Sequence, residues 1–154
     1  IASCKFFLGN TSGIYFLPTV FGVPGALANM TPLAASLPLT PANLGIPKLI
    51  WSLREQRHLN FKEVLDSPMA NFRTSQLYAD AGVRLEENAP EDIRDLAMEM
   101  LDRIEGRAVY TQQDECLQRE FKELLRPGHY AYGADSRVGR NFLRKYASLL
   151  PKHG

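Results

Sequence analysis

The first 53 residues carry only two charged side chains, Lys5 and Lys48, and no carboxylate. An uncharged, apolar segment of about 20 residues can cross a membrane. Here, however, six prolines and the polar turn at residues 10–13 divide the uncharged stretch 6–47 into shorter pieces. The basic region and small-residue cleavage pattern of a signal peptide are also missing. The stretch therefore predicts the buried core of an α/β domain.

Length and composition support a single domain over residues 1–154. A chain of 154 residues that is 45% hydrophobic can bury a sufficient core. This excludes a disordered chain, a collagen-like repeat and a disulfide-stapled miniprotein. Cys4 and Cys116 are too few for a disulfide framework or a metal site, and reduced thiols fit a cytoplasmic protein. We therefore expect no bound metal and a cytoplasmic location.

The remaining charges are unevenly distributed. Residues 54–125 have more acids than bases, whereas residues 126–154 contain six bases and only Asp135 as an acid. The total of +1 argues against a general nucleic-acid-binding protein. The basic end can approach an anionic membrane surface, which would make the protein peripheral at the inner face of the membrane. The plain alternative is a solvated helix face.

The opening of the chain predicts one βαβ unit. Residues 5–8 form a short apolar run that is typical of a buried strand, and a polar turn at 10–13 follows. A helix is expected over 14–21, closed by Gly22, and a second apolar strand over 23–28. Such a unit favours a parallel sheet with helices on its faces, and hence a Rossmann-like α/β fold. Three clear strands are few for a complete Rossmann half, so this one is expected to be incomplete.

The middle of the chain mixes loops, short helices and a third strand. Four prolines predict a long loop over residues 29–47, and Pro47 is placed to begin a helix that runs to about Arg57. Asn60 and Glu63 have the spacing of a capping box for a helix over 61–65. A further helix over 75–81 ends at Gly82, and a strand follows at 83–87.

The last third predicts a helical extension over residues 107–154, after a long helix. Pro90 and two acids at the next positions are typical of a helix start, and an apolar stripe continues to Gly106. Thr111 and Asp114 resemble a capping box for the next helix. Ser136 is the expected cap of the last helix.

The turn after the first strand is the best candidate for a binding site. Asn10, Thr11, Ser12 and Gly13 follow a strand and open a helix, where backbone N–H groups lack internal partners and the helix dipole favours an anion. Glycine permits close approach of a ligand, and no carboxylate lies nearby in the sequence. These features suit a phosphate or diphosphate. The alternative is an ordinary turn in which Thr11 or Ser12 only caps the helix.

Three bases after the proline-rich loop are candidate phosphate contacts. Lys48, Arg54 and Arg57 lie close together in the sequence, and arginine can make forked contacts to phosphate. The alternative is that they occupy a solvated helix face.

Two stretches of the chain resemble glycosyltransferases. Residues 4–28, CKFFLGNTSGIYFLPTVFGVPGALA, are similar to the βαβ segment in the C-terminal, donor-binding half of GT-B glycosyltransferases. Residues 46–65, IPKLIWSLREQRHLNFKEVL, resemble a bacterial glycosyltransferase-like family linked to surface carbohydrates. The start of the long helix, NAPEDI at 88–93, is similar to late helices of GT-B chains. In total the resemblance spans residues 4–105.

The resemblance implies a function and a partner. Asn10, Thr11, Ser12 and Gly13 would face the diphosphate of a nucleotide sugar, which is then transferred to an acceptor without a metal. The chain begins with Ile1, so we expect a fragment or processed chain that lacks an N-terminal acceptor-binding domain and is inactive alone. Two alternatives stay open: a nucleotide-sugar epimerase of similar fold, and a non-catalytic module that binds a phosphate ligand or a partner.

Overall fold

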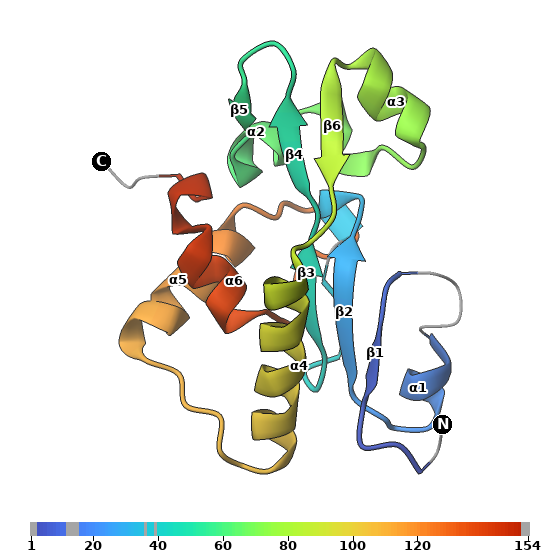
Figure 1. The fold of residues 1–154 in the computed structure, drawn as a ribbon, viewed down its shortest axis with the longest axis vertical. Helices are drawn as coiled ribbons and strands as arrows, with labels where there is room; N and C mark the ends of the chain where they lie inside the picture. The colour runs from blue at the N-terminus through green and yellow to red at the C-terminus, as the bar shows by residue number, and fades with distance from the viewer. Residues whose placement is uncertain (1–2, 12–15, 36, 39, 152–154) are drawn as a thin grey trace.

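Two sheets form the framework of the molecule (Figure 1), for which a computed structural model describes residues 3–11, 16–35, 37–38 and 40–151. The first sheet has four parallel strands in the order β1-β2-β3-β7, and the second has three antiparallel strands in the order β5-β4-β6. The strands of the parallel sheet are β1 (Phe7–Gly9), β2 (Gly25–Met30), β3 (Leu44–Pro47) and β7 (Arg137–Val138). Those of the antiparallel sheet are β4 (Leu49–Ser52), β5 (Arg57–His58) and β6 (Val83–Glu86).

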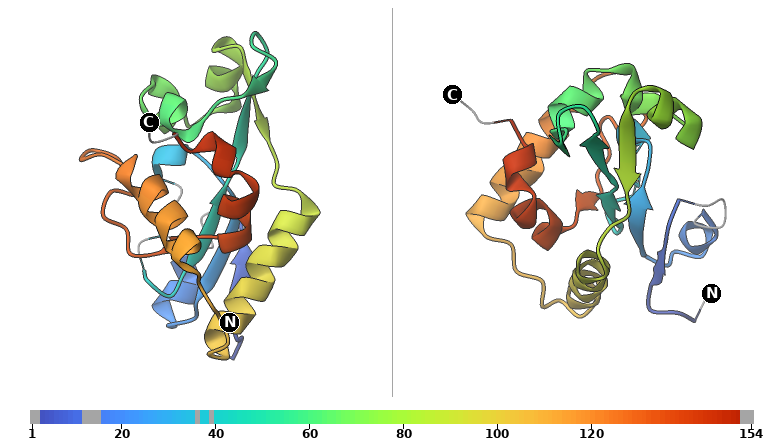
Figure 2. Two further views of the ribbon diagram at one scale, coloured as in Figure 1. Left: turned by 90° about the vertical axis from the view of Figure 1, so that its left-hand side faces the viewer. Right: turned by 45° about the horizontal axis from the view of Figure 1, so that its top comes forward.

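The helices surround the parallel sheet unevenly. They are α1 (Phe16–Val20), α2 (Phe61–Leu65), α3 (Ser75–Asp80), α4 (Pro90–Ile104), α5 (Gln112–Glu123) and α6 (Arg140–Lys145), with 3-10 turns η2 (Leu33–Ala35), η3 (Pro68–Asn71) and η4 (Ala147–Leu149). Helix α4 packs against β2 and β3, and α6 packs against α4 and α5. In Figures 1 and 2, α1 lies beside β1, away from these three helices. None of the described helices has the length and apolar character needed to cross a membrane.

The predicted βαβ unit is confirmed. β1 and β2 pair in parallel, with Phe7 beside Gly25, and α1 connects them. The turn after α1 has Gly22 at a φ of 67°, a left-handed conformation that glycine adopts without steric cost. The chain is therefore a mixed α/β protein with the parallel sheet and flanking helices that its opening segment predicted, whereas the antiparallel sheet β5-β4-β6 was not predicted.

The uncharged first third supplies the middle of this sheet. All four residues of β3 are buried, and so are five of the six residues of β2. Leu96 and Met100 of α4 are fully buried residues of the same apolar core. Strands of a parallel sheet are covered on both faces, so a charge in β2 or β3 would lose its hydration.

The predicted helix from Pro47 to Arg57 is wrong. This segment is the end of β3, then β4, a tight hairpin and β5. The apolar residues Leu49, Ile50 and Leu53 fit helical spacing, but a short apolar run fits a buried strand as well. Strand β4 instead pairs with β6, with Ile50 opposite Leu85, 35 positions further along the chain. This long-range pairing makes the segment a strand.

Three other expectations also differ from the structure. Part of the expected loop 29–47 forms η2 and the buried strand β3. Ser136 does not cap the last helix, because its hydroxyl donates to the carbonyl of Pro38, and Gly139 is the residue before α6. The segment 107–154 also contains the two-residue strand β7, which pairs with β3.

Signals that act within a few residues are confirmed. Asn60 and Glu63 form a reciprocal capping box at α2, and Thr111 and Asp114 form another at α5. Gly82 follows α3 with a φ of 70°. These motifs were recognisable because both partners of each interaction lie within one helical turn.

Candidate functional site

A pocket lies where β1, β2 and β3 end. Open parallel sheets commonly bind ligands at the carboxyl ends of their strands. The cavity volume is about 270 Å³, and its lining residues are Asn10, Thr11, Asn29, Thr31, Lys48 and Glu87. We call it the strand-end pocket. Six polar residues from four separate segments meet here, although they are spread over 78 positions of the sequence.

The end of β2 is shaped by an irregularity. The register of β2 against β3 shifts between Leu27 and Met30, and Asn29 has a φ of 54°. Asn29 and Asn88 then exchange two hydrogen bonds of 2.6 Å, in which each backbone N–H donates to the other's side-chain oxygen. Asn88 also donates through Nδ2 to the Pro47 carbonyl at 2.8 Å. This partly buried amide pair ties the ends of β2 and β3 to the segment before α4.

Lys48 stands between the two sheets. Its backbone N–H donates to the Met30 carbonyl at 2.9 Å, directly after β3 and directly before β4. Its Nζ lies 2.5 Å from Oε1 of Glu87. The lysine side chain is only 19% exposed, whereas the glutamate side chain is 68% exposed. The pocket thus contains a shielded cation whose carboxylate partner faces solvent.

A second hollow adjoins the first, because both are lined by Thr31 and Lys48. This side pocket has a volume of about 300 Å³ and extends toward α3. Its further lining residues are Pro32, Phe72, Arg73, Thr74, Ser75, Tyr78 and Leu85. The two hollows together offer cations, hydroxyls, amides and one aromatic surface to a ligand.

Tyr78 fixes one wall of the side pocket. Its hydroxyl donates to the Phe72 carbonyl at 3.1 Å and lies 3.2 Å from Oγ1 of Thr31. The Phe72 and Tyr78 rings meet edge to face at 5.3 Å. Burial raises the pKa of Tyr78, so the hydroxyl stays protonated and holds Thr31 in place at neutral pH.

Arg73 adds a second positive charge. It lies on the exposed segment before α3, and within the described part of the chain no carboxylate pairs with it. Lys48 and Arg73 therefore outweigh Glu87 by one charge. A pocket with this balance and many hydroxyl groups suits an anionic, hydroxylated ligand.

The sequence-predicted residues are only partly brought together. Asn10 and Thr11 line the strand-end pocket beside Lys48, whereas Ser12 and Gly13 lie outside the described residues. Arg54 and Arg57 line neither hollow. Arg57 instead forms a forked ion pair with Glu63, at 2.9 and 2.7 Å, near the β4–β5 turn, and this contact raises its pKa.

The sequence reasoning named none of the other lining residues as site residues, among them Asn29, Thr31, Arg73, Tyr78 and Glu87. Asn29 and Thr31 follow the predicted strand 23–28, so the rule that sites form at strand ends could have found them. The sequence alone could not place Glu87 at the strand-end pocket, because its position depends on the pairing of β6 with β4. Its presence means that the strand-end pocket is not free of carboxylates, in contrast to the sequence around the turn.

The site residues offer polar contacts but no obvious metal ligands. Among the described residues, no group of three or more His, Cys, Asp and Glu side chains could hold a metal ion. Comparison with protein-family models, with curated proteins and with solved structures found no match to the chain.

Proposed function

We propose that the chain is the donor-binding domain of a GT-B-like glycosyltransferase and that the strand-end pocket and the side pocket together hold a nucleotide diphosphate sugar. The observation that carries the proposal is the meeting of Asn10, Thr11 and Lys48 at the carboxyl ends of parallel strands. This is where α/β domains of many kinds bind phosphorylated ligands. Among phosphorylated ligands, we choose a nucleotide diphosphate sugar because residues 4–28 resemble GT-B chains.

The physical role of the pocket would be to stabilise negative charge. When a sugar leaves a nucleotide diphosphate, charge develops on the diphosphate oxygens. Lys48 and Arg73 would compensate that charge, while the amides and hydroxyls of Asn10, Thr11 and Thr31 would fix the ligand. Such stabilisation needs no metal. The catalytic base would come from an N-terminal acceptor-binding domain, and the acceptor would be a surface carbohydrate made at the inner face of the membrane.

Ligand-dependent thermal stability tests the proposal. A ligand that binds only the folded chain raises its melting temperature. UDP, GDP and their sugar conjugates are titrated into the parent chain and into Lys48→Gln and Arg73→Gln. We expect at least one nucleotide to raise the melting temperature. Lys48→Gln should weaken its binding roughly tenfold, since a charge-assisted hydrogen bond contributes about 1.5 kcal/mol.

Lys62→Gln is the matched control. Lys62 is an exposed lysine on α2 that pairs with Asp66 and lines neither hollow. Its substitution should leave nucleotide affinity unchanged. Equal binding by Lys48→Gln and the parent chain would contradict the placement of the phosphate. Binding of inorganic phosphate as tightly as of any nucleotide would favour a non-catalytic phosphate-binding module, and conversion of the bound sugar to its epimer would favour an epimerase.

A further inference from the structure

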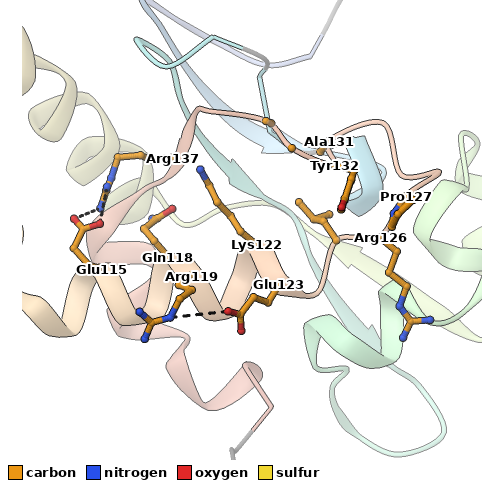
Figure 3. A pocket seen from close by; sticks show the side chains of 13 residues that line it. Glu115, Gln118, Arg119, Lys122, Glu123, Arg126, Pro127, Ala131, Tyr132 and Arg137 are labelled. Atoms are coloured by element: carbon orange, nitrogen blue, oxygen red, sulfur yellow. Dashed lines mark hydrogen bonds and ion pairs between the residues drawn. The ribbon is translucent and has the colours of Figure 1, made fainter.

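A larger cavity lies beside α5 (Figure 3). It has a volume of about 710 Å³ and is lined by α5 and the segment that leads from α5 to β7. This volume is typical of pockets that hold small organic ligands. We call it the α5 pocket. None of the described residues that line it also lines the strand-end pocket or the side pocket, so it would be an independent site.

The floor of the α5 pocket is apolar. Leu125, Ala131 and Ala134 line it and are buried residues of the core. The backbone N–H of Ala131 donates to the Ala34 carbonyl at 2.8 Å, which anchors the loop to η2. This wall of the cavity is therefore preformed and offers an apolar surface to a ligand.

Most charged residues around the cavity already have partners. The Arg137 guanidinium donates to both carboxylate oxygens of Glu115, at 3.1 and 2.9 Å. Arg119 lies 4.0 Å from Glu123, and Arg126 lies 2.5 Å from Asp66. These pairs leave the rim close to neutral.

Lys122 is the exception. Figure 3 shows its side chain extending from α5 toward the segment that carries Ala131 and Tyr132, between Arg137 and Tyr132. It is half-buried, and its ammonium group has no hydrogen bond or ion pair within the described part of the chain. Burial and, after it, the positive charge of Arg137 lower the pKa of Lys122, more than Asp135 and Glu115 raise it. An unpaired, partly desolvated cation is costly to the fold, and a bound anion would remove that cost.

Arg137 makes the adjoining wall rigid. Its guanidinium lies 3.9 Å from the centre of the Tyr110 ring, and the side chain is only 18% exposed. Its Nε is buried and has no hydrogen-bond partner among the described residues. The second cation of the pocket is thus held in place by Glu115 and Tyr110 and retains an unsatisfied donor.

We propose that the α5 pocket binds a small organic anion, a carboxylate or a phosphate monoester. Its charged group would be held by Lys122 beside Arg137, and its apolar part would lie against Leu125, Ala131 and Ala134. The proposal goes beyond nucleotide-sugar binding and does not depend on it. A small molecule fits this site because the cavity has the volume of a ligand pocket and, among the described residues that line it, Lys122 is the one unpaired cation.

Phenyl phosphate and benzoate are suitable probes, with benzyl alcohol as their neutral counterpart. Binding is measured by calorimetry or by ligand-observed NMR on the full chain. We expect at least one of the two anions to bind, and benzyl alcohol to bind at least tenfold more weakly. Lys122→Met keeps the apolar stem of the lysine, and it should weaken anion binding at least tenfold. Lys5→Met, at an exposed lysine that pairs with Glu105 and does not line the pocket, should not change it.

The reactivity of the Lys122 amine gives a second measurement that needs no variant. A limiting amount of an amine-acetylating reagent is added near pH 8, and the modified lysines are identified by mass spectrometry. Lys122 should react faster than the more exposed Lys62, because burial lowers the pKa of the Lys122 amine, and phenyl phosphate should slow the reaction at Lys122 alone. The proposal is overturned if neither anion binds, if Lys122→Met binds both as well as the parent chain, or if the probe protects all lysines equally.

Discussion

Two sets of ion pairs in this molecule have opposite arrangements. In the helical layer, by which we mean α4, α5 and α6, the buried partners are Asp114 and Asp92, with side chains 2% and 5% exposed. They pair with Arg144 and Lys145, which are 44% and 47% exposed. At the strand-end pocket the cation Lys48 is the shielded partner, 19% exposed, and Glu87 faces solvent at 68%. In the helical layer the buried charge is negative, and at the pocket the shielded charge is positive.

The burial of one or the other partner distinguishes ion pairs that stabilise the fold from an ion pair that can take part in ligand binding. A buried carboxylate cannot lose its partner without leaving an uncompensated charge inside the protein, so the pair belongs to the fold. A solvent-facing carboxylate can move away at little cost, and an anionic ligand can then take its place beside the lysine. The helical layer should therefore respond to substitution through stability, and the pocket through affinity.

The largest effect is expected for Arg144→Met. Arg144 donates through Nε and Nη2 to the two oxygens of Asp114, at 2.6 and 2.7 Å, and this pairing lowers the Asp114 pKa to about 2. Removal of the guanidinium leaves only the capping contacts of Thr111 with the buried carboxylate. We expect a loss of about 2 kcal/mol in the free energy of unfolding at pH 7, measured by urea denaturation.

Arg94→Met is the matched control on α4. The Arg94 side chain is 68% exposed, and its partner Asp95 is 30% exposed. Such a pair contributes little, so the free energy of unfolding should change by less than about 0.5 kcal/mol. Equal losses in Arg144→Met and Arg94→Met would show that burial of the carboxylate does not distinguish the two pairs.

The next effect is on the acid dependence of stability. The Asp114 pKa is lower in the folded chain than its ordinary value of 3.8, so the folded state binds fewer protons than the unfolded state. The resulting stability is present above pH 4 and is lost as the pH falls toward 2. We therefore expect the difference of about 2 kcal/mol between the parent chain and Arg144→Met to shrink to less than about 1 kcal/mol at pH 2.5. The other carboxylates are common to both chains and cancel in this comparison; a difference that stays constant with pH would contradict the role given to Asp114.

How much of the fold could be predicted from the sequence depends on whether an interaction is local or long-range. The capping boxes at Asn60 and Thr111 depend on neighbours three residues away, and both were found. The strand β4 depends on pairing with β6, and the two-residue strand β7 depends on β3. Local spacing cannot reveal such pairings, because an apolar run such as Leu49–Ile50 is compatible with either a helix or a strand.

The candidate site was partly predictable for a similar reason. Asn10 and Thr11 follow a strand directly, and Lys48 interrupts a long uncharged segment, so each is conspicuous in the sequence. Their nearness in space was not predictable, because Lys48 was expected on a helix. Glu87 joins the pocket only through the antiparallel sheet, which places the end of β6 beside the end of β3.

The smallest effect is expected for Glu87→Gln. It tests most directly whether the Lys48–Glu87 pair differs from the ion pairs of the helical layer. The substitution removes the carboxylate that competes with an anionic ligand for Lys48, so the affinity for the nucleotide that binds best should rise about threefold, a gain of about 0.6 kcal/mol. The gain should vanish in the double variant Lys48→Gln, Glu87→Gln, and it should decrease as salt is added. Stability should change by less than about 0.5 kcal/mol, because the Glu87 side chain is 68% exposed.

Titration calorimetry at low and high salt distinguishes this expectation from its opposite. If Glu87→Gln weakens nucleotide binding, the carboxylate itself contacts the ligand, for example by accepting a hydrogen bond from a sugar hydroxyl. Lys48 and Glu87 would then form one preorganised unit. The pocket would resemble the helical layer in keeping its ion pair intact, and the distinction between exchangeable and structural pairs would not hold for this molecule.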